Sequence, residues 1–135
     1  EIALHCDFVY TTNATKFGDT HTKFGLRPTW GMSQTLSRAV GQRRARELSF
    51  TAKTFNGAQA VVWGIANESF ETVEALDDAL AATCAQIIAN STEAVAAMKD
   101  LYRLAEREEG VRASLEREPG LEYRISDTSK RLSKF

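Results

Sequence analysis

Residues 16–31, KFGDTHTKFGLRPTWG, gather several reactive or bulky side chains between two apolar segments. They include a histidine, an aspartate, an arginine and a tryptophan, whereas a segment that only connects two elements is usually short and polar. Among them, His21 is best suited to acid–base chemistry, because an unperturbed imidazole titrates at about pH 6.5. The segment therefore predicts a site that contains His21. A second interpretation stays open, in which His21 only caps the turn and hydrogen-bonds a backbone carbonyl.

Other polar residues along the chain have simpler explanations. Glu1 and His5 are four residues apart and would share one face of a helix, which is compatible with a metal pair. A metal site needs a third and a fourth ligand, however, and the sequence offers none nearby, so no metal is expected. The basic cluster of Arg43, Arg44 and Arg46 is best explained as the solvated face of an amphipathic helix.

Composition and charge exclude several classes of protein. The chain has 135 residues, of which 43% are hydrophobic and 26% are charged, so a globular protein with a modest core is expected. A formal net charge of -1 favours neither nucleic acid nor an acidic membrane as a partner. Because no apolar run is long enough to span a membrane and no leader is recognisable, we expect a cytoplasmic protein. Cys6 and Cys84 form no metal or redox motif, which suits a reducing compartment, and both are predicted to be buried.

The elements that would position these residues can be read from the pattern of apolar residues. Residues 2–6 predict a short buried helix that runs into a strand within residues 7–12, and residues 15–17 predict a second short strand. After the loop with His21, helices are predicted at 30–40, 42–55 and 56–64, the first ended by Gly41 and the second followed by Asn56. A short strand is expected within residues 65–70.

The second half has a different organisation. Apolar residues recur at spacings of three and four from residue 72 to residue 108, which predicts two long amphipathic helices with Asn90 or Ser91 as the cap between them. Residues 111–135 are more polar, are interrupted by Pro119 and Gly120, and end in a short amphipathic stretch that would pack on the core or on a partner. We therefore divide the chain into residues 1–70 and residues 71–135.

An ordered series of motif residues resembles the second half of crotonase-superfamily proteins, the enoyl-CoA hydratase and isomerase family. The family pattern runs E-L-A-x-x-C-D, F-G-x-P-E, G-x-x-P-G-x-G-G-T-Q-x-L-x-x-x-x-G and A-x-x-x-G-L-V. The residues in register with it are Glu1, Ile2, Ala3, Cys6, Asp7, Phe17, Gly18, Gly25, Pro28, Gly31, Gln34, Leu36, Gly41, Ala60, Gly64, Ile65 and Ala66. As an ordered set, these landmarks are far more specific than any one of them.

The resemblance implies an α/β fold that is mostly helical in this chain. Residues 1–70 would complete a crotonase-like spiral core of ββα units, and residues 71–135 would form a helical C-terminal region used for oligomerisation. Family members are about twice as long, so the resemblance also implies a missing N-terminal half of the same fold as a partner. That half would supply one N–H donor of the oxyanion hole, and the other would come from a glycine turn just before Glu1. Assembly as a homotrimer or hexamer is expected.

The resemblance implies that Glu1 and His21 are the catalytic pair of a lyase of fatty acid metabolism. Glu1 matches the first family glutamate, and His21 stands where the second is expected, since F-G-x-P-E has become F-G-D-T-H. In family hydratases, water adds to a 2-enoyl-CoA while N–H donors stabilise charge on the thioester oxygen. We expect Asp19 and the turn at Gly18 to fix the approach of His21, and a charged His21 to donate the α-proton.

The remaining expectations concern substrate binding and alternative activities. Coenzyme A is implied only as part of the acyl-CoA substrate, with no separate cofactor. The site would be lined by Leu26, Thr29, Trp30 and Met32, with Trp30 shielding it from bulk water. Lys130, Arg131 and Lys134 would either meet the coenzyme A phosphates or form a solvated helix face. Hydration, isomerisation, hydrolysis through the histidine and binding of acyl-CoA without catalysis all remain open, because Thr29 and Met32 replace two glycines of the family pattern.

Overall fold

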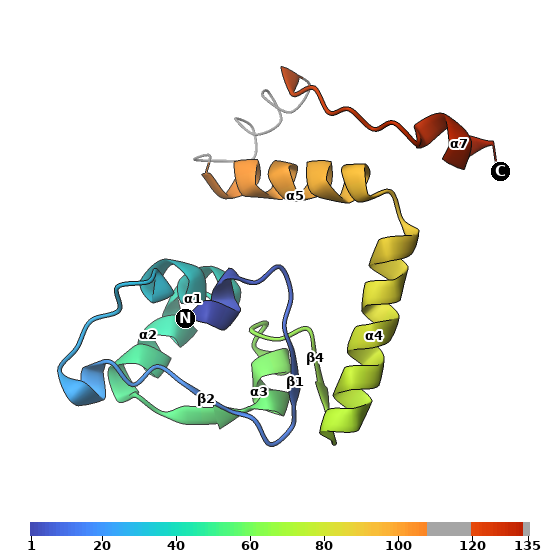
Figure 1. Ribbon diagram of the computed structural model, residues 1–135. Helices are drawn as coiled ribbons and strands as arrows, with labels where there is room; N and C mark the ends of the chain where they lie inside the picture. Colours follow the sequence, from blue (N-terminus) through green and yellow to red (C-terminus); the bar gives the residue numbers. More distant parts are fainter. Residues whose placement is uncertain (108–119, 134–135) are drawn as a thin grey trace. The chain divides into compact units, whose positions relative to one another are not determined.

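The computed structural model describes residues 1–107 and 120–133 (Figure 1). The chain forms two compact units, Glu1–Leu80 and Ala81–Phe135. The first unit contains the whole segment with His21 as well as Glu1, so it positions the candidate site. The second unit is helical in its described part and is considered separately.

Two small sheets form the frame of the first unit. Strand β1, Tyr10–Thr12, pairs in parallel with β4, Glu68–Phe70. Strand β2, Lys16–Gly18, pairs antiparallel with β3, Thr54–Asn56. Parallel strands cannot be joined by a tight hairpin, and here β1 and β4 are connected through a crossover that contains the other strands and three α-helices. The strands expected within 7–12 and 65–70 and near 15–17 are confirmed.

Two 3-10 turns and three α-helices complete the first unit. The 3-10 turn η1 spans Ile2–His5, and a second, η2, spans Thr22–Phe24. Three α-helices follow, α1 at Met32–Val40, α2 at Gln42–Thr51 and α3 at Gly57–Val62. Gly41 separates α1 from α2 with a φ of 76°, a conformation that favours glycine, so the predicted helix end at Gly41 is confirmed.

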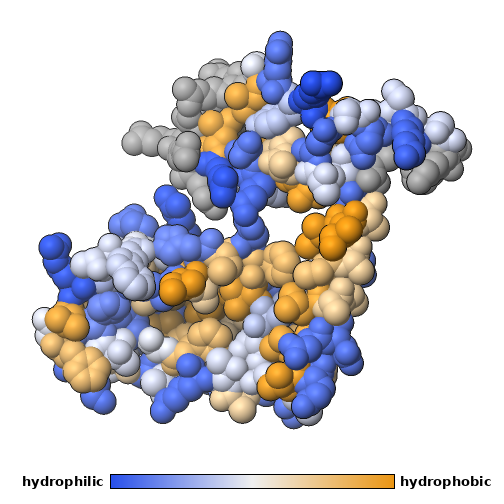
Figure 2. All heavy atoms as spheres, in the orientation of Figure 1, coloured by the Kyte–Doolittle hydropathy of each residue, from blue (hydrophilic) through white to orange (hydrophobic). Residues whose placement is uncertain are grey.

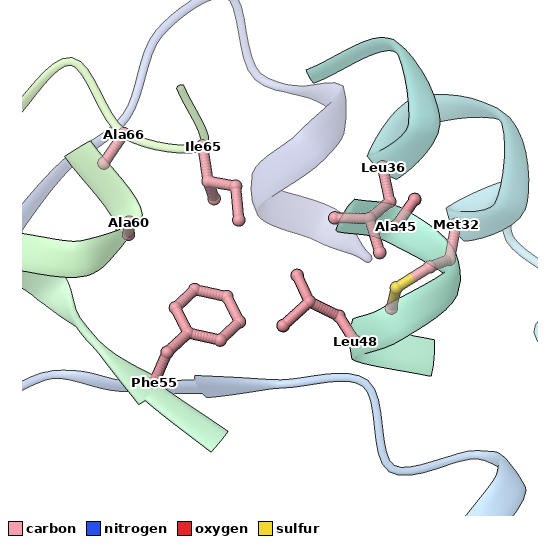
Figure 3. Packing of buried hydrophobic residues seen from close by; sticks show 8 residues of the cluster. All are labelled: Met32, Leu36, Ala45, Leu48, Phe55, Ala60, Ile65 and Ala66. Carbon is pink, nitrogen blue, oxygen red and sulfur yellow. The ribbon is translucent and has the colours of Figure 1, made fainter. Parts of the chain in front are cut away.

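The core of the first unit lies between α1, α2, β3 and α3 (Figure 3). Its buried residues are Met32, Leu36, Ala45, Leu48, Phe55, Ala60, Ile65 and Ala66. Phe55 from β3 points into this cluster and also stacks on Phe17 of β2, with ring centroids 5.6 Å apart. Because α1 is packed on this core, the loop that joins η2 to α1 is anchored at its α1 end, and near its other end the Thr22 hydroxyl donates a hydrogen bond to the backbone oxygen of Ser49 in α2.

Gly57, the first residue of α3, fixes the contact between α3 and β1. A Cβ atom at this position would lie 1.9 Å from the backbone oxygen of Thr12, a distance that no real side chain could adopt. The turn of α3 is begun by Asn56, whose side chain accepts a hydrogen bond from the backbone N–H of Gln59, while the Gln59 side chain accepts one from the N–H of Asn56. This reciprocal capping confirms the helix start predicted near Asn56.

Three expectations for burial and secondary structure are wrong. The turn at Ile2–His5 has no buried residue, and Ile2 is 71% exposed, because none of the described elements packs over its outer side. Cys6 and Cys84 are both exposed rather than buried. The helix predicted over 42–55 ends at Thr51, where Ala52 adopts a φ of 50°, and Thr54–Asn56 instead pairs with β2. Strand pairing has overridden the local helical pattern there.

The structure confirms the two long helices predicted between residue 72 and residue 108. Helix α4 spans Val73–Ala89 across the boundary of the units, and α5 spans Thr92–Arg107. Ser91 caps α5, because its hydroxyl accepts a hydrogen bond from the N–H of Ala94. A short helix, α7, spans Thr128–Leu132 within the predicted terminal amphipathic stretch, whose last residue, Phe135, lies outside the described residues.

Segment 126–127 is attached to the start of α5 within the second unit. Glu93 accepts hydrogen bonds from the backbone N–H and the hydroxyl of Ser126, and Ser91 bonds to Asp127.

Apolar side chains also reach the surface of α5, among them Val95, Met98 and Tyr102. Figure 2 shows apolar residues beside hydrophilic ones on the visible face of the molecule. None of the helices in the described ranges has the length and apolar character needed to cross a membrane.

Candidate active site

Glu1 is held by the backbone at the start of α1. It occupies the N-cap position of η1, and its Oε1 accepts hydrogen bonds from the N–H groups of Trp30, at 3.1 Å, and Met32, at 3.4 Å. N–H groups at a helix start attract anions, because they are unpaired within the helix and lie at its positive end. One carboxylate oxygen of Glu1 is therefore fixed, and Oε2 remains for another partner.

That second oxygen faces His21. The distance from Glu1 Oε2 to His21 Nε2 is 3.9 Å, and the side chains are 13% and 23% exposed, respectively. This separation is too long for a direct hydrogen bond, but one water oxygen can lie about 2.8 Å from both atoms. The structure thus brings together the two residues that the sequence pattern singled out, in a geometry that can hold one small molecule between them.

Asp19 orients the imidazole from the other side. Its Oδ1 lies 2.7 Å from His21 Nδ1 and also accepts the backbone N–H of His21 at 3.2 Å. Asp19 is only 5% exposed. Burial alone would raise the pKa of this carboxyl group, but hydrogen bonds from Ser49 and His21 outweigh it, and the pKa of Asp19 lies below its ordinary value. Asp19 is therefore an ionised acceptor that directs the Nδ1 proton toward itself and leaves Nε2 facing Glu1.

The end of α2 supports this loop. Ser49 bonds to Asp19 through its side chain, and its backbone oxygen accepts the hydroxyl of Thr22 at 2.6 Å. Both contacts are made by Ser49 in the last turn of α2, and Leu48 and Ala45 of the same helix are buried in the core. The orientation of His21 consequently depends on packed helical structure and not only on its own loop.

His5 has a role that the sequence analysis missed. Its Nε2 lies 2.6 Å from the backbone oxygen of Trp30, and its ring lies against Gly31. The spacing of four between Glu1 and His5 did indicate one helix face, but it was interpreted only as a possible metal pair. His5 is used for this contact, and the described residues include no group of three or more His, Cys, Asp and Glu side chains placed to hold a metal ion.

The residues expected to bind substrate differ in their surroundings. Leu26, Thr29 and Trp30 are exposed, and Trp30 is 64% exposed, whereas the side chains of Glu1 and His21 are only 13% and 23% exposed. The side chain of Met32 is instead buried in the core at 7% exposure, and only its backbone N–H reaches Glu1.

The residues expected to bind coenzyme A lie in the second unit. Lys130 is exposed on α7. The side chain of Arg131 and the whole of Lys134 lie outside the described residues.

Comparisons with known proteins agree with the motif pattern. The family model described as enoyl-CoA hydratase/isomerase matches residues 1–133. Probable enoyl-CoA hydratase 1, peroxisomal, of Arabidopsis thaliana is 43% identical over 79 residues, which cover 58% of this chain and 30% of that protein. The chain therefore spans about a third of the length of the curated relatives it matches.

Solved structures show the same fold. A probable enoyl-CoA hydratase/isomerase from Mycobacterium abscessus has a TM-score of 0.78 at 26% identity, covering 99% of this chain and 48% of that one. The enoyl-CoA hydratase from Mycobacterium smegmatis has a TM-score of 0.72 at 35% identity, covering 76% of this chain and 46% of that one. The chain is an α/β portion of the crotonase fold and belongs to the enoyl-CoA hydratase/isomerase family.

Proposed function

We propose that this chain carries the acid–base pair of an enoyl-CoA hydratase, a lyase that adds water to a 2-enoyl-CoA thioester. The observation that carries the proposal is the approach of Glu1 Oε2 to His21 Nε2 at 3.9 Å, with the far side of each group fixed. Glu1 is fixed by two backbone N–H groups and His21 by Asp19. Two titratable groups that face one small gap are what the addition of water requires.

The proposed step uses one proton acceptor and one proton donor. Glu1 takes a proton from water as the water oxygen forms a bond to the β-carbon of the enoyl thioester. The charged form of His21 gives its Nε2 proton to the α-carbon, which has gained the electron pair of the double bond. Glu1 then returns its proton to His21 across the 3.9 Å gap through a water molecule. The net reaction consumes one water and leaves both side chains in their starting forms.

A second candidate is hydrolysis of the thioester, which the Asp19–His21 pair favours. A carboxylate behind Nδ1 leaves Nε2 as a proton acceptor, as in sites where an imidazole activates a nucleophile. Water activated in this way would attack the carbonyl carbon and release free coenzyme A as a thiol. Hydration releases no thiol, so thiol detection with an enoyl-CoA and with the saturated acyl-CoA separates the two reactions.

The experiment that tests the proposal replaces His21 in the full-length protein that contains this chain. His21→Gln is expected to lower kcat for a short 2-enoyl-CoA by about 10²–10⁴-fold, because it removes the proton donor. His21→Glu is expected to retain or restore hydration, since a glutamate stands here in the family pattern. Lys23→Gln, an exposed change two residues away, is the control. Unchanged turnover in His21→Gln would exclude His21 from the chemistry.

The remaining parts of the proposal concern partners and location. The acyl-CoA substrate is proposed from the family, and Lys130, Arg131 and Lys134 are proposed to contact its phosphates. Hydratase activity would further need oxyanion donors from the rest of the fold, outside residues 1–135. We also propose assembly as a homotrimer or hexamer in the cytoplasm. These proposals rest on the family resemblance, on the exposed apolar residues of α5 and, for the location, on the composition of the chain.

A further inference from the structure

Three consecutive peptide groups between Thr29 and Met32 meet two side chains of one short helix. The first and the third of these groups carry the N–H donors of Trp30 and Met32, and both donate to Glu1 Oε1. The middle group carries the Trp30 carbonyl, and its oxygen lies 2.6 Å from His5 Nε2. Because a carbonyl oxygen only accepts hydrogen bonds, His5 donates here with a protonated Nε2.

We propose that His5 is a positioning residue for the Glu1 carboxylate. It acts by fixing the peptide group between Trp30 and Gly31, so that the N–H groups on either side keep pointing at Glu1 Oε1. The inference rests on the proposed function for its effect on turnover, but the contact it describes can be tested independently. It gives His5 a defined role in place of the metal pair considered from sequence.

The need for such a contact follows from Gly31. Gly31 has a φ of 89° and forms the N-cap of α1. Glycine adopts this conformation at no steric cost, but it also leaves it more readily than other residues do. A rotation of the peptide group before Gly31 would tilt both neighbouring N–H groups and release Glu1. The bond to His5 opposes that rotation at its centre.

The space around Gly31 agrees with this role. A Cβ atom built on Gly31 would lie 3.4 Å from Cε1 and 3.5 Å from Nε2 of His5, so the imidazole ring occupies the side of the backbone that a larger residue would use. His5 itself is exposed and lies outside the hydrophobic core. Its loss should therefore change the local backbone without unfolding the unit, in contrast to a substitution of Leu36 or Leu48.

The contact of His5 affects the site because it influences the position of the second carboxylate oxygen of Glu1, Oε2. Glu1 is the N-cap residue of η1 and His5 is its last residue. Both bond to the same backbone segment, Glu1 through an N–H group and His5 through a carbonyl oxygen. If the segment shifts, Oε2 moves relative to His21 Nε2, now 3.9 Å away. Misplacement of a catalytic group by about 1 Å can lower a rate by about 10²-fold.

The test compares His5→Leu, which removes the donor, with His5→Gln, whose side-chain amide has an N–H at a similar distance from the backbone. In the full-length protein, we expect His5→Leu to lower kcat by about 10–100-fold with a KM within about twofold of the parent value. We expect His5→Gln to stay within about threefold. If His5 contributed only to folding, the folded fractions of His5→Leu and His5→Gln would have the same kcat as each other and as the parent protein.

Backbone amide exchange measured by NMR provides the readout that does not depend on activity. Exchange at Trp30 and Met32 should be faster by about tenfold or more in His5→Leu than in His5→Gln, with unchanged exchange at Leu48 in the core. Equal exchange and equal turnover in both variants would overturn the inference. If neither the parent nor the variants hydrate enoyl-CoA but the exchange rates differ as expected, the proposed function fails and the positioning role of His5 stands.

Discussion

Asp19 provides the sharpest test of how the site is organised, because its substitution by Asn changes charge with almost no change in volume. The carboxylate of Asp19 receives the Nδ1–H and the backbone N–H of His21 and a hydrogen bond from Ser49. Asn offers one acceptor oxygen and an NH₂ group in place of two carboxylate oxygens. If the NH₂ group faces Nδ1, the imidazole must carry its proton on Nε2 instead.

The expected magnitude follows from these contacts. A hydrogen bond to a charged acceptor contributes about 1.5–3 kcal/mol and a neutral one about 0.5–1.5 kcal/mol, so Asp19→Asn should cost roughly 1–2 kcal/mol of stability. Turnover should fall by more than this loss implies, because both the orientation and the tautomer of His21 change. A comparable substitution behind the histidine of a serine protease lowers kcat by about 10⁴-fold, which sets an upper limit. We expect a decrease of about 10²–10³-fold here.

The assay is steady-state hydration of a short 2-enoyl-CoA by the full-length protein, with thermal unfolding measured in parallel. Asp77→Asn on the exposed surface of α4 is the matched control, with the same chemical change and no expected effect. A variant of Asp19 that loses stability but keeps its kcat would refute the reasoning, since Asp19 would then support the loop without acting on the imidazole. Loss of kcat with little loss of stability would support it most strongly.

Asp19 should also make the stability of the folded protein depend on pH in the acid range. The pKa of Asp19 is lower in the folded protein, because hydrogen bonds from Ser49 and His21 outweigh the effect of burial. Its contribution to stability is therefore complete above the unfolded pKa of about 3.9 and is lost as the pH falls through the lower folded value. Between about pH 5 and pH 2, Tm of Asp19→Asn should fall less steeply than that of the parent protein. Parallel Tm profiles would contradict this assignment.

Two further predictions concern packing and assembly. Gly57→Ala should destabilise the protein by about 3 kcal/mol or more in denaturant unfolding, because the new methyl group would overlap the backbone of Thr12. Gly120→Ala is the control, since it places a methyl group in open space and should be nearly neutral. Equal stability of the two variants would contradict this packing. The exposed apolar side chains of α5 should be covered by neighbouring subunits, so the full-length protein is expected to sediment as a trimer or hexamer, and a monomer at micromolar concentration would oppose that expectation.

Local signals in the sequence predicted those parts of the fold that local forces determine. Gly41 ended α1 as expected, because the chain needs a positive φ there. The apolar repeat from residue 72 predicted α4 and α5, and their separation at Ser91 agrees with its capping bond. The pairing of Phe55 with Phe17 was missed, since a strand partner almost 40 residues away leaves no periodic signal in a three-residue strand.

The members of the candidate site and the support of His21 by Asp19 were predicted, whereas the contacts made by His5 and Ser49 were not. His21 was singled out by the residue types of segment 16–31, Glu1 through the family pattern, and Asp19 through its closeness to His21 in sequence. The bond from His5 to the Trp30 carbonyl joins residues 25 positions apart, and neither residue type demands it. Burial of Ile2 was predicted from apolar density, but burial depends on which elements cover a face, and sequence density does not specify them.

The central claim is that Glu1 and His21 act as one acid–base pair, and a double-mutant cycle on kcat/KM tests it most directly. Glu1→Gln, His21→Gln and the double variant would be measured with the same short 2-enoyl-CoA in the full-length protein. We predict that each single change lowers kcat/KM by at least about 10²-fold and that the double variant is about as slow as the slower single variant, because residues that act together give non-additive effects. Independent effects that multiply in the double variant, or a single variant with unchanged kcat/KM, would contradict the pairing of the two residues.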